Sequence, residues 1–301
     1  MINSWRPSTR KQYISHIQKW MKFANERKFN PSQIDYKILI EFLTSLYKQG
    51  LSYSSINSAR SAISSISDNE IGSHHIVRRF MKGIFQSRPA LPRYTTTWDP
   101  DIVLQFLKNL GSSEGLSLKN LSLKTVFMLT LFSARRGNTI VNIHVDNIHF
   151  DSEGVTIILG DLTKTSGPNC PSPHIIIKKF SRDADLCVHN VLNLYLQKTQ
   201  TLRGNHKQLF ISYQSPYGPI SRDTLGRWLK EVMKSAGIDI QRFKPHSVRS
   251  ASTSAAFSNK VPITSILASV GWKEESTFRR FYNKPLNQNT GEMAKALTKN
   301  F

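Results

Sequence analysis

Apolar residues recur every three or four positions over the first 85 residues, which is the spacing of one face of an α-helix. Four such stretches follow one another, around residues 8–24, 31–50, 56–66 and 76–84. In the first we expect Trp20 and Met21 to face inward, and in the fourth Ile76 and Met81. The pattern therefore predicts a compact four-helix domain over residues 1–85.

The pattern stops at residues 86–97, which contain two prolines and no apolar period, and we interpret them as a linker. Helical spacing resumes over residues 98–110, 121–132, 186–197, 221–236 and from 246 onward. Two β-branched runs, 154–159 and 174–178, enclose a stretch rich in proline and predict a hairpin with a long tip. Residues 141–148 are consistent with either a helical turn or a strand. The sequence thus predicts a mainly α protein with a small β-sheet, whose second domain, of mixed α+β type, spans residues 98–282.

Residues 283–301 form a separate tail. The chain breaks at Pro285, and Asn289 and Glu292 then have the spacing of a capping box before a short apolar face over residues 289–297. A helix this short is not stable alone, so we expect it to dock on its own domain or on a neighbouring copy.

The charge of the chain narrows the choice of partner. There are 41 Lys and Arg against 20 Asp and Glu, a net charge of +21, and residues 1–97 carry 15 basic and 5 acidic side chains. A polyanion binds such a surface with release of counterions, so double-stranded DNA is the expected partner.

Other classes of protein fit the sequence less well. No apolar run approaches the ~20 residues of a spanning helix, and the first residues lack the apolar core of a signal peptide. Cys170 and Cys187 are too few for a disulfide scaffold and lack the spacing of a zinc site. We therefore expect an intracellular protein without a membrane or metal partner.

The last third of the chain collects groups suited to phosphodiester chemistry. His246 and Arg249 lie three residues apart, on one face of a predicted helix, and Trp272 and Tyr282 follow. A phenol with a pKa near ~10 needs cationic and hydrogen-bonding neighbours before it can act as a nucleophile. This combination predicts attack on a phosphate by tyrosine.

Further cations lie upstream. The apolar helix 121–132 is followed by Arg135 and Arg136, and a charge at the end of a core helix is costly unless it has a partner. Arginine binds phosphate bidentately and stays charged, so an arginine on each of two helices is the expected arrangement. Lys164, at or beside the hairpin tip, is suited to protonate a leaving oxygen as general acid.

With these residues in order, the chain resembles the tyrosine recombinase (phage integrase) family, whose pattern is Arg, Lys, H-x-x-R, His or Trp, then Tyr. Members commonly show T-G-x-R-x-x-E-L at the first arginine. We align this pattern with residues 133–140, Ser-Ala-Arg-Arg-Gly-Asn-Thr-Ile. The alignment assigns Arg136 rather than Arg135 as the catalytic arginine, and it puts Thr139 where an acidic residue is usual. Tyr282 lies one residue further from Trp272 than in many members, and the usual position holds Phe281, which has no hydroxyl.

The resemblance implies a catalytic set of six residues: Arg136, Lys164, His246, Arg249, Trp272 and Tyr282. It implies a 3′-phosphotyrosyl intermediate with a free 5′-hydroxyl, and no metal or nucleotide cofactor. It also implies a homotetramer on two duplexes, closed by the C-terminal helix. The residues around Gly271, Trp272 and Tyr282 most resemble recombinases of eukaryotic mobile elements of the Crypton and DIRS kinds, which would act in the nucleus to integrate or excise an element.

Two alternatives remain open at this point. A type IB topoisomerase uses related chemistry but only relaxes supercoils. A domesticated DNA-binding protein with an inactive site would bind DNA without cutting it.

Overall fold

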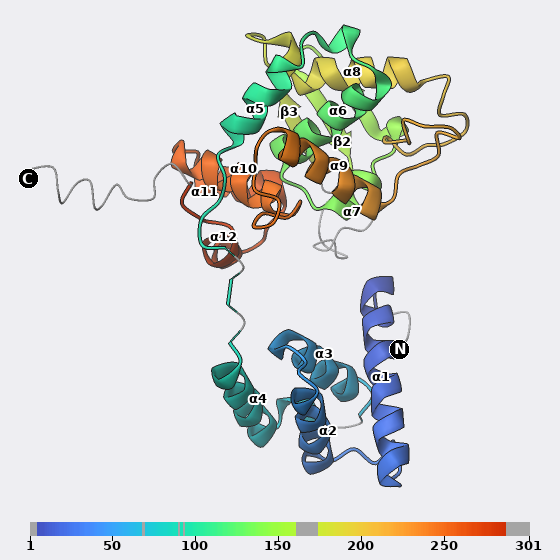
Figure 1. Cartoon of the computed structure of the whole chain (residues 1–301), viewed down its shortest axis with the longest axis vertical. Coiled ribbons are helices and arrows are strands. Elements are labelled where there is room, and N and C mark those ends of the chain that lie inside the picture. The colour runs from blue at the N-terminus through green and yellow to red at the C-terminus, as the bar shows by residue number, and fades with distance from the viewer. Residues whose placement is uncertain (1–4, 68–69, 90, 93, 161–173, 287–301) are drawn as a thin grey trace, which may run out of the picture. The chain divides into compact units, whose positions relative to one another are not determined.

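A computed structural model of the chain describes residues 5–67, 70–89, 91–92, 94–160 and 174–286 (Figure 1). The chain forms two compact units, residues 1–92 and 93–301. Lys164 and the predicted tail helix 289–297 lie outside the described residues.

The described residues of the N-terminal unit form four α-helices, as the apolar pattern predicts, and one short 3₁₀ helix. Its helices begin at defined caps: the Asp35 carboxylate accepts from the amides of Lys37 and Ile38, and Ser52 caps the third helix. Their bounds are α1 Pro7–Arg27, α2 Tyr36–Lys48, α3 Tyr53–Ser64, η2 Ile71–Ser73 and α4 His75–Ser87.

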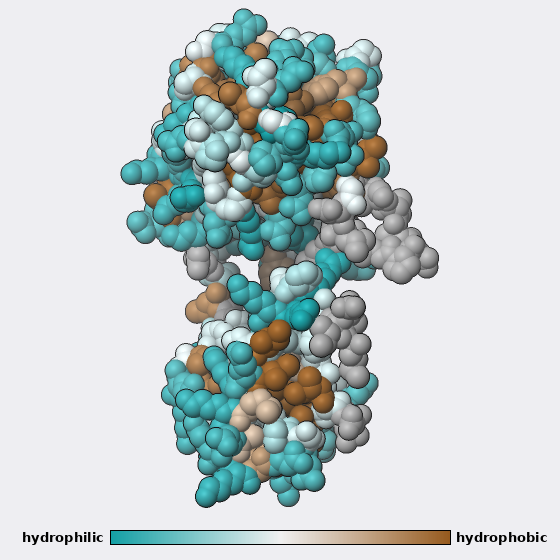
Figure 2. All heavy atoms as spheres, turned by 90° about the vertical axis from the view of Figure 1, so that its right-hand side faces the viewer, coloured by the Kyte–Doolittle hydropathy of each residue, from teal (hydrophilic) through white to brown (hydrophobic). Residues whose placement is uncertain are grey.

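Two of the expected inward positions are wrong. Met21 is 50% exposed and Ile76 is 37% exposed, whereas the buried stripes run through His16, Trp20 and Phe23 in α1 and through Val77, Met81 and Ile84 in α4. Trp20 sets the rotation of α1, because its indole donates to the Pro31 carbonyl at 3.0 Å and its ring lies 5.2 Å from Phe42. Figure 2 shows apolar side chains gathered on one face of this unit.

The C-terminal unit is built around one buried helix. Helix α6, Leu118–Ser133, is buried along nearly its whole length and packs against α8, α9, α10 and β3. The fold class is confirmed: the unit is mainly helical with a small antiparallel sheet, whose strand β3 packs against α6 and α8 (Figure 1). The other helices are α5 Pro100–Asn109, η3 Ser113–Gly115, α7 Gly137–Val141, η4 Val145–Asn147, η5 Ala184–Leu186, α8 Val188–Thr199, α9 Arg222–Ser235, α10 Ser247–Ser258, α11 Ile263–Val270 and α12 Glu275–Phe281.

The sheet has three strands in the order β1-β2-β3, with both pairs antiparallel. β2 (Gly154–Ile158) and β3 (His174–Lys178) are the predicted hairpin, paired with Val155 opposite Ile177. β1 (Ile148–Phe150) begins at the last residue of the region 141–148, which the sequence left open between helix and strand. Within that region α7 contributes its last residue, Val141, and η4 covers residues 145–147. Alternate residues of β3 are buried, so its β-branched residues cover the core on one face.

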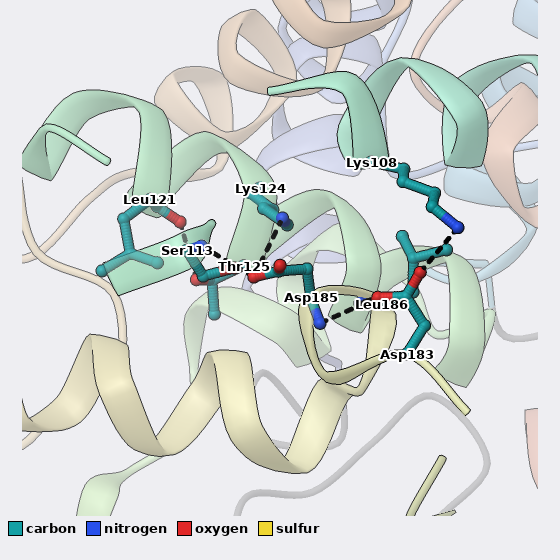
Figure 3. A network of polar contacts seen from close by, with 8 residues as sticks. All are labelled: Lys108, Ser113, Leu121, Lys124, Thr125, Asp183, Asp185 and Leu186. Carbon is teal, nitrogen blue, oxygen red and sulfur yellow. Dashed lines mark hydrogen bonds and ion pairs between the residues drawn. The ribbon is translucent and has the colours of Figure 1, made fainter. Parts of the chain in front are cut away.

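A buried lysine interrupts the apolar surface of α6 (Figure 3). The Lys124 side chain is fully buried, and its ammonium lies 4.0 Å from the carboxylate of Asp185, which also accepts from the Ser113 amide at 2.7 Å. Burial lowers the pKa of Lys124, and the negative charge of Asp185 opposes that change. Lys124 and Asp185 therefore join α6 to two short turns: η3, which precedes α6, and η5, which precedes α8.

Within the part of the chain that the structure describes, no helix has the length and apolar character needed to cross a bilayer.

Replacing Gly154 tests the hairpin. A Cβ at this position would lie 2.2 Å from the Ile177 carbonyl oxygen, so we expect Gly154→Ala to lower the free energy of unfolding by about 1–3 kcal/mol in a urea titration. Gly115→Ala is the control, because no atom lies within 4 Å of its added Cβ. Equal stability of the two variants would contradict the close packing of β2 on β3.

Candidate active site

Four of the predicted site residues come together at one end of the C-terminal unit. His246 precedes α10, Arg249 lies on its first turn, Trp272 follows α11, and Tyr282 ends α12. The Nε2 atom of His246 lies 3.1 Å from the Tyr282 hydroxyl, and the Trp272 and Tyr282 rings lie 4.5 Å apart. The phenol is thus in hydrogen-bonding contact with an imidazole.

Arg249 is 2% exposed and lies against both rings, with its guanidinium carbon 4.6 Å from the Trp272 ring and 5.4 Å from the Tyr282 ring. One of its nitrogens donates to the Val270 carbonyl at 3.4 Å, while its Nε has no partner among the described residues. Burial and the positive charge of Arg136 lower the pKa of Arg249, and Tyr282 opposes this. Since arginine remains protonated near neutral pH, the site holds a buried cation that has no anionic partner among the residues that the structure describes.

Arg136 reaches the same site from α6. Helix α6 ends at Ala134, which has a left-handed backbone (φ 46°), and the chain turns there so that Arg136 becomes the N-cap of α7. The half-buried Arg136 lies close enough to lower the pKa of both His246 and Arg249. Thr139 lies on α7, where its amide donates to the Arg136 carbonyl at 2.8 Å.

A cavity of about 530 Å³ opens beside these groups. Among the described residues that line it, five are Arg or Lys and one, Asp223, is acidic. The basic residues are Arg135, Arg222, Arg227, Lys230 and Arg249, and His246 also lines the wall. A cavity with this excess of positive charge is suited to an anion.

The charge around His246 fixes its protonation state. Burial is the largest effect, and the positive charges of Arg249, Arg136 and Arg222 act in the same direction to lower the pKa of His246 below its usual 6.5. The imidazole is therefore neutral at pH 7 and can accept a proton from the Tyr282 hydroxyl.

The position of Tyr282 is set by two serines of α10. The Tyr282 carbonyl accepts from the Ser250 hydroxyl at 3.1 Å and from the Ser254 hydroxyl at 2.6 Å. Tyr282 is half-buried, whereas Phe281 is 56% exposed. The backbone thus directs the phenol, and not the preceding ring, toward His246.

The segment after Tyr282 is attached to the segment that precedes α5. The Thr97 amide donates to the Pro285 carbonyl at 2.9 Å. The Lys284 ammonium donates to the Tyr94 carbonyl at 2.7 Å and lies 3.8 Å from the centre of the Tyr94 ring. The segment that follows Tyr282 is therefore held against residues 94–97 of the same unit.

Sequence reasoning missed several residues of this region. Ser250 and Ser254 are four residues apart on the helix that follows His246, and that spacing was the available signal. For Arg222 and Lys284, nothing in the sequence except their positive charge indicated a place in the site. Among the described residues, no group of three His, Cys, Asp or Glu side chains could hold a metal ion.

The lowered pKa of His246 leads to a test on the protein without DNA. Because the folded-state pKa lies below 6.5, the imidazole should stay neutral as the pH falls through 6.5 and become protonated only at a lower pH. NMR titration of histidine-labelled protein measures this, with the signal assigned by its loss in His246→Asn. A midpoint at or above 6.5 would contradict the arrangement of charges described above.

Two family models match the chain. Residues 98–289 match the model of the phage integrase family, and residues 3–67 match that of the phage integrase N-terminal SAM-like domain. No curated protein matches the chain in sequence.

Solved structures share the fold. A post-cleavage complex of the XerH site-specific recombinase with a palindromic difH substrate has a TM-score of 0.64 and 16% identity, covering 96% of this chain and 79% of that one. The Tn1549 transposon integrase in complex with transposon right-end DNA has a TM-score of 0.60 and 12% identity, with coverages of 94% and 99%. A lambda integrase tetramer bound to a Holliday junction has a TM-score of 0.53 and 15% identity, with coverages of 92% and 72%. Since the family model covers most of the chain, this protein belongs to the phage integrase family.

Proposed function

We propose that this enzyme, a site-specific recombinase that breaks and rejoins DNA, uses Tyr282 as its nucleophile. The observation that carries the assignment is the 3.1 Å contact between the Tyr282 hydroxyl and Nε2 of His246, next to the buried and unpaired Arg249. A phenol in contact with a neutral base and beside a free cation has what it needs to attack a phosphodiester.

In the first step the Tyr282 oxygen bonds to the scissile phosphorus and its proton passes to His246. The bond from phosphorus to the 5′-oxygen breaks, and that oxygen takes a proton from Lys164. The product is a 3′-phosphotyrosyl link and a free 5′-hydroxyl. Attack by a 5′-hydroxyl of another strand reverses these steps, so the energy of the phosphodiester bond is kept in the enzyme–DNA link.

Positive charge supplies the stabilisation of the transition state. Arg136 and Arg249 face the non-bridging oxygens, where negative charge persists throughout the reaction. The Trp272 indole Nε1 is buried without a partner among the described residues, so it is available to donate to one of these oxygens.

The remaining assignments concern the setting of the reaction. The basic cavity beside Arg249 and the excess of basic residues in the first 97 positions support DNA as the substrate. We assign to the tail after Leu286 the closure of a tetramer on two duplexes, which the lambda integrase tetramer supports. The residues around Trp272 and Tyr282 support a mobile element of the Crypton or DIRS kind, active in the nucleus of a eukaryotic host.

A covalent trap tests the nucleophile. A library of nicked duplexes with a randomised core is incubated with the protein, denatured adducts are recovered, and sequencing gives both the selected duplex and the cleaved phosphate. We expect wild-type protein to form adducts and Tyr282→Phe to form none, because phenylalanine has no hydroxyl.

A register swap is the matched control. The variant Tyr282→Phe with Phe281→Tyr has the same composition as the wild type, yet its hydroxyl stands at a position that is 56% exposed. It should also form no adduct. Adduct formation by the swapped variant, or tight binding of the selected duplex by wild type with no adduct, would sink the assignment.

The two serines that hold Tyr282 give a second test. Ser250→Ala with Ser254→Ala removes the two hydrogen bonds to the Tyr282 carbonyl and the one that the Lys284 amide donates to Ser254, each worth about 1 kcal/mol. We therefore expect single-turnover cleavage to slow by about tenfold or more. Affinity for the selected duplex should not change. Ser269→Ala is the control, since its exposed hydroxyl bonds only within α11. A loss of DNA affinity equal to the loss of rate would show that these serines do not act by positioning the phenol.

A further inference from the structure

Arg135, the neighbour of Arg136, is itself part of the anion site. It is 6% exposed, and one of its terminal nitrogens donates to the His174 carbonyl at 2.8 Å. The other lies so close to Gly271 that an added Cβ there would be 2.3 Å away. The guanidinium is therefore fixed between the start of β3 and the turn before Trp272.

This fixed cation is incompletely partnered. Its Nε is buried with no hydrogen-bond partner, and no carboxylate among the described residues pairs with it. Burial and the charge of Arg136 lower the pKa of Arg135, and Arg135 in turn lowers that of Arg249. Two buried cations that repel each other, with no counterion, are costly in the free protein.

A second buried arginine in the same unit shows the contrast. Arg203 donates to the carbonyls of Gln208 and Leu209, at 2.6 and 3.2 Å, and to the Thr199 hydroxyl at 2.6 Å. None of its nitrogens is left buried without a partner. The chain itself thus satisfies the buried donors of Arg203, which lies outside the basic cavity, whereas it leaves Nε of Arg135 without a partner among the described residues.

Arg135 also lines the basic cavity, together with Arg249 and His246. Three buried donors in this region lack partners among the described residues: Nε of Arg135, Nε of Arg249 and Nε1 of Trp272. An anion bound here would accept hydrogen bonds from these donors and would also balance the positive charge.

We propose that Arg135 is a third arginine that balances the charge of the scissile phosphate, oriented for this task by the His174 carbonyl and the close approach of Gly271. The inference rests on the function proposed above. The family pattern assigns two arginines to the phosphate, here Arg136 and Arg249. The proposal adds Arg135, which lies between Ala134, at the pattern's glycine position, and Arg136.

The test removes charge from each side in turn. Arg135→Gln keeps a side chain that can donate to the His174 carbonyl but removes the charge, and a methylphosphonate at the scissile position of the selected duplex removes the charge of the phosphate. We expect Arg135→Gln to slow single-turnover cleavage of the phosphate duplex by about 10²-fold, and Arg135→Lys to recover part of the rate. On the methylphosphonate duplex, Arg135→Gln and wild type should react at equal rates.

Binding gives a readout that does not require cleavage. In the Tyr282→Phe background, Arg135→Gln should weaken binding of the phosphate duplex by about tenfold and leave binding of the methylphosphonate duplex unchanged. Arg203→Gln is the matched control for loss of a buried arginine, and its effects should be the same on both duplexes.

Equal losses for Arg135→Gln on the two duplexes, or no loss on either, would overturn the inference, because the charge of Arg135 would then not act on the phosphate. Failure of the proposed function is distinct from this outcome. It would appear as wild-type protein that forms no adduct with the phosphate duplex.

Discussion

The burial of positive charge with no counterion in the described part of the chain is the constraint on which the C-terminal unit depends. Arg249 lies against two aromatic rings, and its Nε has no partner among the described residues; Arg135 is buried nearby, and its Nε also lacks a partner there. In water each guanidinium would be solvated, so their burial lowers the stability of the free protein. The rest of the unit must supply enough packing energy to hold these charges in place. In the proposed reaction, the DNA phosphate that enters the site restores the lost electrostatic stabilisation.

That packing comes from α6 and α10. Helix α6 is buried on all sides and delivers Arg135 and Arg136 at its end, while α10 delivers Arg249 and the two serines that fix the tyrosine. The start of α10 is held by the Trp98 indole, which donates to the Ser247 hydroxyl at 2.8 Å. Each reactive group is therefore attached to a rigid element, so little reorganisation is needed when substrate binds.

Much of the fold could be predicted from local pattern, and the failures have identifiable causes. β-branched residues at 154–158 and 174–178 predict their strands because alternate residues cover one face of the core. Met21 and Ile76 were placed inward because helical spacing gives a stripe but not its rotation, which for α1 is set by Trp20 and its contacts with Phe42 and Pro31. Of the site, His246, Arg249, Trp272 and Tyr282 could be placed together from their order and chemistry. The serines and Arg135 could not, because their partners lie 28 or more residues away and are backbone carbonyls, which no residue type reveals.

The pairing of residues 94–97 with residues 284–286 has a mechanical consequence. The chain enters and leaves the C-terminal unit at the same point, joined by the bond from the Thr97 amide to the Pro285 carbonyl and by Lys284 on the Tyr94 carbonyl. Tension applied through residue 94 or residue 286 must act on these bonds first. Lys284 and Pro285, which form them, lie two and three residues after Tyr282. Whatever is covalently attached before residue 94 or after residue 286 is therefore anchored beside Tyr282, and any force that it exerts acts there.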